Sequence, residues 1–445
     1  MHSVSTLRDP IRLIPLLFSG AILVGTFLLW LPFSTADGAK TDLLTAFFTA
    51  TSAVAVTGLI TVDTATHWSG FGQGVILLLF QIGGFGIMTA ATLFGLMAGR
   101  GFGLRERMAT NVERSRLEVG DAKSVLKLVF LITVCVEIVV AAMLATRLVL
   151  HYNHSFGEAL WHGVFHSVSA FNNAGFSSYS DSVMGFQSDP FVLIPIMFAV
   201  ILTALGFPVM QDLKQHGFQW KSWTLHTKLT VTGTILLLVG GFIATLAMEW
   251  DNPATLGPMG VSTKLLNAAF HSVMPRTAGF NSLDVGAFRD ETLMTNYFLM
   301  FIGGGSAGTA GGIKITTFAV LIAVVVSEVL RRRDANAFGR RFSHEIERQA
   351  LTVIVLAGIL IFAATTYLSI ITPLEFEDLL FETISAFSTV GLSTGITADL
   401  PAAGQLVIIM LMFVGRVGTI TVATALALGG EPRPYRYPEE NPIVG

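Results

Sequence analysis

The stretch Thr51-Ser-Ala-Val-Ala-Val-Thr-Gly-Leu59 decides the fold, because similar stretches recur three more times along the chain. The other copies are Val168-Ser-Ala-Phe-Asn-Asn-Ala-Gly-Phe176, Ser272-Val-Met-Pro-Arg-Thr-Ala-Gly-Phe280 and Ile384-Ser-Ala-Phe-Ser-Thr-Val-Gly-Leu392. Successive glycines in this pattern lie roughly 110 residues apart, which is far longer than one solenoid unit. Such an interval holds about two membrane crossings and one re-entrant helix. Four equivalent glycines therefore indicate a pore.

The composition is that of an integral membrane protein. Of the 445 residues, 52% are hydrophobic and only 13% are charged, and the mean hydropathy is +0.67. Such a chain cannot cover a single core with an ordinary water-facing surface. The formal net charge of -3 gives no reason to expect nucleic acid as a partner. The single cysteine, Cys135, excludes an internal disulfide framework.

The apolar runs alternate between long and short. Runs long enough to cross about 30 Å of hydrocarbon lie near 11–33, 70–99, 124–150, 189–211, 227–250, 292–330, 349–372 and 402–429. Shorter runs near 42–57, 157–174, 262–278 and 376–390 each end at one of the four glycines, so we interpret them as re-entrant pore helices. A further glycine lies in each second span, at Gly84, Gly206, Gly304 and Gly415.

We therefore predict an all-α membrane protein of four tandem span–pore helix–span repeats. Its eight transmembrane helices and four re-entrant pore helices surround one pseudo-four-fold pore. The expected repeats are 1–100, 101–222, 223–341 and 342–429, followed by a tail at 430–445.

The distribution of charge assigns the two sides of the membrane. Lys and Arg concentrate in the linkers that follow the second spans, and the positive-inside rule makes these linkers and both termini cytoplasmic. All repeats then share one orientation, which disfavours an inverted-repeat transporter. The opposite side is rich in Asp and Glu, including Asp63, Asp181, Asp284 and Glu382, and an acidic mouth attracts cations. The alternative is that few of these carboxylates face the entrance.

The glycine segments are the candidate selectivity filter. Glycine reaches backbone angles that aim carbonyl oxygens at an axis, and four copies would make a ring that replaces the hydration shell of a cation. The candidate residues are Val56, Thr57, Gly58, Asn173, Ala174, Gly175, Thr277, Ala278, Gly279, Thr389, Val390 and Gly391. Thr57, Thr277 and Thr389 are candidates to brace these segments. The alternative is that the glycines only permit close helix packing.

A glycine-rich stretch in the third repeat is the candidate gate. Each of its glycines costs roughly 1 kcal/mol against alanine in a helix interior, so the span should unwind there. The candidate residues are Gly303, Gly304, Gly305, Ser306, Ala307, Gly308, Thr309, Ala310, Gly311, Gly312 and Lys314, together with Arg416 in the last span. A static kink is the alternative. We expect Arg416 to face the pore, where it could either bond carbonyls of the loop or limit cation occupancy; the alternative is a snorkelling or structurally paired arginine.

Several polar residues remain without a clear role. Glu137, inside the third span, has no partner that the sequence identifies. His162 and His166 have the i, i+4 spacing of metal ligands. Because His166 and His271 occupy similar places near the ends of their short helices, we prefer a repeated pore-helix position to a metal site.

These features together resemble the Trk/Ktr/HKT superfamily of potassium transporters, in particular its KtrB-type membrane subunits. The resemblance spans the chain and rests on the four glycines, the glycine-rich loop, Arg416 and the ending Tyr435-Arg-Tyr-Pro-Glu-Glu-Asn-Pro-Ile-Val-Gly445. The first span leads directly into the first pore helix, which favours the Ktr type over the longer Trk type. In this family, glycine at all four filter positions accompanies a preference for potassium, so Gly58 implies potassium as the transported ion, with sodium as a second candidate.

The resemblance also implies partners. It implies a homodimer in the bacterial inner membrane, docked on a cytosolic KtrA-type regulatory ring that binds ATP or ADP. No nucleotide is expected on this chain, because it offers no soluble domain to hold one. The basic linkers could contact the ring or, alternatively, anionic membrane lipid.

Two other function classes stay open from the sequence. A secondary transporter that couples potassium to sodium or protons differs from a channel-like pore in its flux law. A membrane-embedded histidine metalloenzyme is a more distant alternative. We expect a transporter rather than an enzyme.

Overall fold

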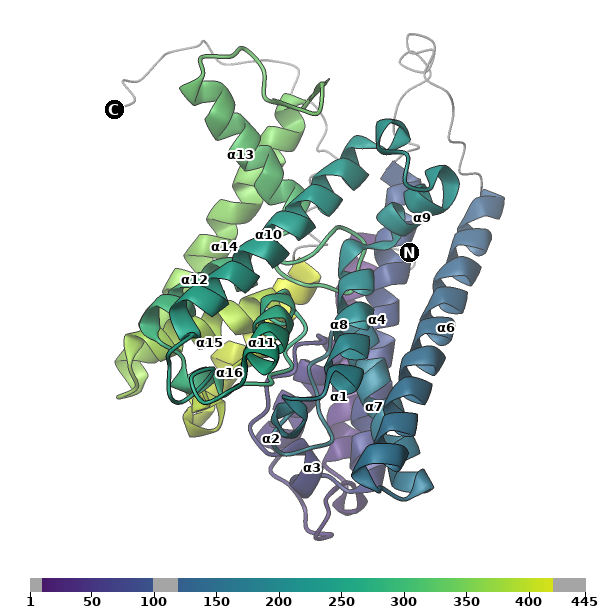
Figure 1. Ribbon diagram of the computed structural model, residues 1–445, viewed down its shortest axis with the longest axis vertical. Coiled ribbons are helices and arrows are strands. Elements are labelled where there is room, and N and C mark those ends of the chain that lie inside the picture. Colours follow the sequence, from purple (N-terminus) through teal and green to yellow (C-terminus); the bar gives the residue numbers. More distant parts are fainter. Residues whose placement is uncertain (1–9, 99–118, 419–445) are drawn as a thin grey trace, which may run out of the picture.

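The computed structural model describes residues 10–98 and 119–418, and the regular structure in these residues is almost entirely helical (Figure 1). The predicted tail at 430–445, both termini and the basic residues of 99–118 lie outside the described residues. The only strands in the described part are β1 (Asn336–Ala337) and β2 (Arg340–Arg341), which form a small antiparallel hairpin.

The order of the helices repeats along the chain. The first group is α1 (Pro10–Leu29), α2 (Leu43–Val54), α3 (Thr64–His67) and α4 (Gly70–Ala98). The second is α6 (Val119–Tyr152), α7 (Phe156–Asn172), α8 (Pro190–Leu205) and α9 (Phe207–His216). The third is α10 (Leu225–Glu249), α11 (Val261–Val273), α12 (Asp290–Phe301) and α13 (Ile315–Val329). The fourth is α14 (His344–Ile371), α15 (Phe376–Ser388), α16 (Ala402–Phe413) and the π-helix η7 (Val414–Gly418).

Short 3-10 turns connect several of these helices. They are η2 (Pro32–Ser34), η3 (Met184–Phe186), η4 (Trp220–Ser222), η5 (Val285–Ala287) and η6 (Ile396–Asp399).

Local sequence explains where the short helices begin. Asp42 caps α2 by accepting a hydrogen bond from the backbone of Leu44, and Ser155 forms a capping box with Glu158 at the start of α7. The four short helices α2, α7, α11 and α15 all lie in the lower half of Figure 1, and each packs against the long helix that precedes it. The glycine segments that follow them are thereby brought to one level of the molecule.

The long helices have the length and polarity of membrane spans. Among the described residues, three helical stretches are each long and apolar enough to cross a membrane: Lys127–Tyr152, Leu225–Glu249 and His344–Ile371. Helices α8 and α9 are long and apolar enough together, as a bent pair. Exposed apolar side chains such as Ile138, Leu236 and Phe362 cover their outer faces, as contact with lipid requires. The coarse prediction of a helical membrane protein is confirmed.

Three predicted spans differ in detail from the structure. The expected continuous span at 189–211 is wrong, because the chain bends by 91° between α8 and α9. Gly206 has φ +85° at this bend, and Pro208 follows it without a backbone donor. The run at 292–330 is broken between α12 and α13, where the glycines predicted unwinding. The last span continues beyond Phe413 as a π-helix, and 419–429 lie outside the described residues.

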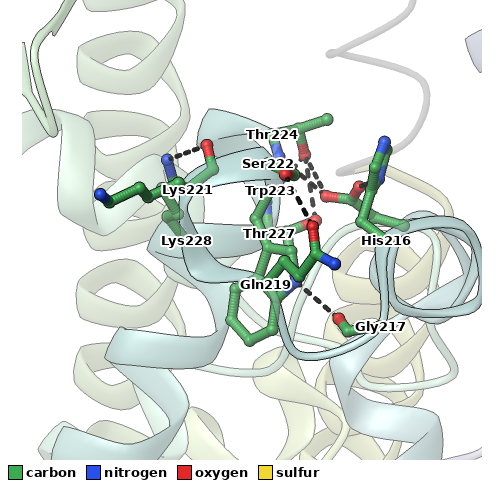
Figure 2. A network of polar contacts seen from close by, with 10 residues as sticks. His216, Gly217, Gln219, Lys221, Ser222, Trp223, Thr224, Thr227 and Lys228 are labelled. Carbon is green, nitrogen blue, oxygen red and sulfur yellow. Dashed lines mark hydrogen bonds and ion pairs between the residues drawn. The ribbon is translucent and has the colours of Figure 1, made fainter.

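The connection between α9 and α10 folds back on itself through polar contacts, shown in Figure 2. The indole of Trp223 donates to the carbonyl of Gly217 at 2.8 Å, and Asp212 accepts from the backbone and hydroxyl of Thr224 at 2.8 and 2.9 Å. The ring of Trp220 contacts Phe338 of the β1–β2 hairpin, with 5.7 Å between ring centroids. Two linkers that the charge pattern placed on the same side are therefore in contact.

Candidate functional site

The four glycines form a closed ring of contacts. A Cβ atom on Gly58 would overlap the carbonyl oxygen of Ala174, the residue before Gly175. In the same way Gly175 faces the carbonyl of Ala278, Gly279 faces that of Val390, and Gly391 faces that of Thr57. Each glycine thus touches the residue that precedes the next glycine, and the fourth returns to the first. All twelve predicted filter residues lie in this ring or adjoin it.

The backbone of the four segments follows one pattern. Each glycine has a positive φ, at +92° for Gly58, +70° for Gly175, +72° for Gly279 and +92° for Gly391. Two residues earlier, Val56, Asn173, Thr277 and Thr389 also have positive φ, between 49° and 70°. Positive φ at every second position turns neighbouring peptide groups in a way that a regular helix or strand does not. A side chain at any of the glycines would be strained, and at Gly58, Gly279 and Gly391 it would also collide with a carbonyl oxygen.

Serines that we did not single out hold three of the segments. The hydroxyls of Ser52 and Ser385 accept from the backbone N–H of Gly58 at 3.1 Å and of Gly391 at 3.2 Å. The hydroxyl of Ser169 donates to the carbonyl of Phe176 at 2.8 Å. Three of the repeated stretches share a Ser-Ala pair, and this recurrence could have indicated the role of the serines from the sequence. The third stretch has Val273 at that place instead.

The third segment is held from behind by a buried arginine. Arg276 is 2% exposed and donates through Nη1 to the carbonyl of Thr234 on α10 at 3.0 Å. The backbone also differs, because Ala278 N–H bonds the carbonyl four residues earlier, whereas Thr57, Ala174 and Val390 bond the carbonyl five residues earlier. The third segment is therefore held by a side chain and a backbone hydrogen bond that differ from those of the other three segments.

A cavity of about 390 Å³ opens on one side of the ring. Its lining includes all four glycines and three carboxylates, Asp63, Asp181 and Asp284. Burial raises the pKa of Asp63, but hydrogen bonds from Ser180 and from the backbone of Ala65 outweigh it and hold that pKa below the ordinary 3.8. Glu382, which we expected among the acids of the mouth, is fully buried and does not line this cavity, and the same is true of Glu249. Only some of the predicted acids thus line the cavity.

The predicted gate loop lies against three of the four segments. Gly305 N–H donates to the carbonyl of Ala204 at the end of α8 at 2.7 Å. Gly311 N–H donates to Thr277 Oγ1 at 3.1 Å, and a Cβ on Gly311 would overlap the hydroxyl of Thr389. Thr309 Oγ1 lies 3.5 Å from the carbonyl of Phe171 at the end of α7.

The two predicted intramembrane cations are both near this region. Lys314 Nζ donates to the carbonyl of Ala310 within the loop at 2.5 Å. Arg416 is 3% exposed and lies 3.4 Å through Nη1 from Thr389 Oγ1, so it contacts the fourth glycine segment. Two of the three predicted bracing threonines, Thr277 and Thr389, therefore bond the loop or the arginine. In the described residues Thr57 Oγ1 has no hydrogen-bond partner.

The glycines of the second spans press against the short helices. A Cβ on Gly415 would overlap the carbonyl of Phe387, and one on Gly83 would overlap the carbonyl of Val54. Phe387 and Val54 precede their filter glycines by the same number of residues. The equivalent of Gly415 in the first repeat is thus Gly83 rather than the predicted Gly84, which packs on the side chain of Asn172.

Three histidines serve as hydrogen-bonding groups, of which His166 and His271 are buried and His162 is half-buried. His166 Nε2 lies 2.9 Å from Ser177 Oγ, and His162 Nδ1 lies 2.6 Å from Ser178 Oγ. His271 Nε2 lies 3.0 Å from Asn296 Oδ1 on α12. Counted from its glycine, His271 is one residue nearer than His166, so the two are not strictly equivalent. No group of three or more potential metal ligands occurs in residues 10–98 and 119–418.

Glu137 has neighbours that the sequence did not identify. Its backbone carbonyl accepts from Ser167 of α7 at 2.6 Å. Its carboxylate lies near Gln81 and Asn172, which bond each other at 2.5 Å. The cluster joins α4, α6 and α7 beside the second filter segment.

This geometry defines a helical membrane protein in which four glycine-ended segments close a ring beside a cavity. Comparison with known proteins agrees. The family model described as "TrkH: Cation transport protein" matches residues 19–431. The Ktr system potassium uptake protein B of Bacillus subtilis is 40% identical, over 98% of this chain and 97% of its own length.

Two further similarities fit this result. The potassium/sodium uptake protein NtpJ of Enterococcus hirae is 37% identical, over 98% of this chain and 97% of its own length. The crystal structure of the potassium transporter TrkH from Vibrio parahaemolyticus aligns with a TM-score of 0.73, covering 94% of this chain and 84% of that one. At 18% identity it supports the fold alone.

The chain belongs to the TrkH family of cation transport proteins. The predicted resemblance is confirmed, and the protein is a transporter rather than an enzyme.

Proposed function

We propose that this protein takes up potassium through a pore whose selectivity filter is the ring of Gly58, Gly175, Gly279 and Gly391. The closed ring of glycine-to-carbonyl contacts carries the proposal, because backbone oxygens and no side chains lie where the four segments approach one another most closely. The names of the relatives from Bacillus subtilis and Enterococcus hirae, potassium uptake and potassium/sodium uptake, favour potassium with sodium as a second ion.

The proposed architecture has four span–pore helix–span repeats, at 1–100, 101–222, 223–341 and 342–429. The repeated helix order and the common backbone pattern of the four segments support this division. In this architecture, helices that are too short to cross the membrane alone, such as α12 and α16, must combine with the segments that follow them to complete the eight crossings. The acidic cavity faces outward, and the α9–α10 and α13–α14 connections face the cytoplasm of a bacterial cell, together with both termini.

The gate in this proposal is the loop from Gly303 to Gly312, with Lys314 and Arg416. Its contacts with the ends of α7 and α8 and with Thr277 and Thr389 support this proposal, because a movement of the loop would then reach the segments around the ring. The loop is held by backbone bonds such as Gly305 N–H to Ala204 and by side-chain bonds of Thr277 and Lys314, and a second arrangement of the loop would exchange these bonds for others.

The proposed partners are a second copy of the chain and a cytosolic nucleotide-binding ring of the KtrA type. The relative from Bacillus subtilis is named as part of a Ktr system, which supports a multi-component assembly. The ring would dock on the cytoplasmic connections, where Trp220 and Phe338 join two linkers that carry Lys221 and Arg340. Anionic membrane lipid is the second candidate for these basic residues.

Ion-coupled symport is the alternative function, and the sodium in the name of the Enterococcus hirae relative favours keeping it. Electrical recordings from proteoliposomes separate the two. A potassium pore gives a reversal potential that follows the potassium gradient and ignores an added sodium gradient. A reversal potential that moves with the sodium or proton gradient in fixed proportion would replace the pore with a coupled transporter.

A further inference from the structure

Within residues 10–98 and 119–418, the carboxylates of Glu249 and Glu382 are fully buried, and only that of Glu249 is satisfied by hydrogen bonds. Glu249 accepts from Asn252 Nδ2 and Thr255 Oγ1 at 2.6 Å each, from Arg289 N–H at 3.0 Å and from Thr292 Oγ1 at 2.5 Å. Two donors on each oxygen explain its burial without any ion.

Glu382, on the pore helix α15, lacks such support. Its exposed fraction is 0%, and its Oε1 accepts a short hydrogen bond from Thr397 Oγ1. Its Oε2 has no hydrogen-bond partner, and no ion pair in the described part of the chain involves this carboxylate. An unpaired carboxylate removed from water is costly, so a positive species beside it would offset the burial.

A short path of hydroxyl groups links Glu382 to the outer cavity. Thr397 Oγ1 lies 3.0 Å from Ser393 Oγ, and both Thr397 and Ser393 line the cavity above the ring. Ser393 follows Gly391 by two residues. The hydroxyl of Thr394, also a cavity residue, is buried without a partner as well. The carboxylate is therefore one hydroxyl away from the space through which transported cations would enter.

We propose that Glu382, Thr397 and Ser393 form a binding site for an alkali-metal cation in the wall of the outer cavity, separate from the ring of glycines. The groups are all oxygen donors, which hard cations prefer, and one carboxylate balances a single positive charge. The inference rests on the proposed function only in that the cavity must hold potassium or sodium. A cation here would fasten the chain just after Gly391 and thereby stabilise the fourth filter segment.

Thermal unfolding of the purified full chain in detergent tests the site. KCl or NaCl is titrated into N-methyl-glucamine chloride at constant ionic strength, and the midpoint of the rise in Tm is compared among variants. Glu382→Gln keeps the size of the side chain and one acceptor oxygen but removes its charge. Glu377→Gln, at an exposed position in the first turn of the same helix, is the matched control.

The expected result is a midpoint at least fivefold higher in Glu382→Gln, with Glu377→Gln unchanged from the parent protein. Thr397→Val, which removes one ligand and keeps the carboxylate, should raise the midpoint in the same direction and carries the test if Glu382→Gln does not fold. Gly58→Ala is titrated in parallel. It should keep the rise in Tm at the parent's midpoint that Glu382→Gln loses, which separates this site from the ring.

Identical midpoints in the parent, Glu382→Gln and Thr397→Val proteins would overturn the proposal and assign a bound proton to Glu382 instead. The proposed potassium pore fails on a different measurement, namely the absence of potassium flux from proteoliposomes of the parent protein.

Discussion

Replacing a ring glycine by alanine should reduce the preference for potassium over sodium, and the structure ranks the four positions. Gly58 and Gly391 have the largest φ, +92°, and a Cβ at either would overlap a neighbouring carbonyl oxygen. Gly175 has φ +70°, and a Cβ there would lie 3.0 Å from the carbonyl oxygen of Ala278. The collision at Gly175 is therefore the mildest of the four.

The magnitude follows from the strain. A non-glycine residue held in such a conformation costs about 1–3 kcal/mol, and the segment can relieve that cost only by moving the carbonyls of the ring. If the displaced ring loses a similar free energy of discrimination between the two ions, the potassium-to-sodium permeability ratio falls by about 5- to 150-fold. We expect Gly58→Ala and Gly391→Ala in the upper part of that range and Gly175→Ala near its lower end.

The ratio is measured from reversal potentials of proteoliposomes with opposed potassium and sodium gradients, and Tm reports folding. Gly358→Ala is the matched control, since Gly358 lies within α14 and a Cβ there meets no atom within 4 Å. Unchanged ratios in all the folded ring variants would refute the filter assignment. An equal loss in Gly358→Ala would show that the effect comes from the membrane spans in general.

Three further predictions concern the gate and the mouth. Arg416→Gln should raise basal potassium flux several-fold, because it weakens the contact with Thr389; a lower flux at normal Tm would mean that the arginine aids conduction. Deletion of 304–311 should give high flux that no longer responds to the cytosolic partner with its nucleotide, and activation of normal amplitude would place the gate elsewhere. Asp63→Asn should raise the KM for potassium by less than tenfold, and less still at high ionic strength. Because the pKa of Asp63 is lowered, its charge and its stabilising contribution persist above 3.8 and are lost only as the pH falls through the still lower pKa of the folded protein. Titration of Asp63 should therefore leave the KM for potassium unchanged between pH 7 and 5. A change of KM with pH in that range that disappears in Asp63→Asn would contradict the argument.

The sequence by itself determined the helical membrane class, the positions of the four short helices and the break in the third repeat. These are local properties, since hydropathy over about 20 residues and the helix cost of consecutive glycines are set along the chain. The recurrence of one motif also sufficed to select the residues that form the ring. The family followed from the same motifs.

Only the tertiary structure decided what each polar side chain contacts. The bend at Gly206 was missed because its apolar run looks continuous, and the bend arises where Gly206 packs on the carbonyl of Ser306, far away in the sequence. Glu382 reads as one more acid of an outer mouth until the packing of α15 buries it behind Thr397. Burial and hydrogen bonding depend on neighbours contributed by other repeats, and a linear pattern holds no record of which neighbours those are.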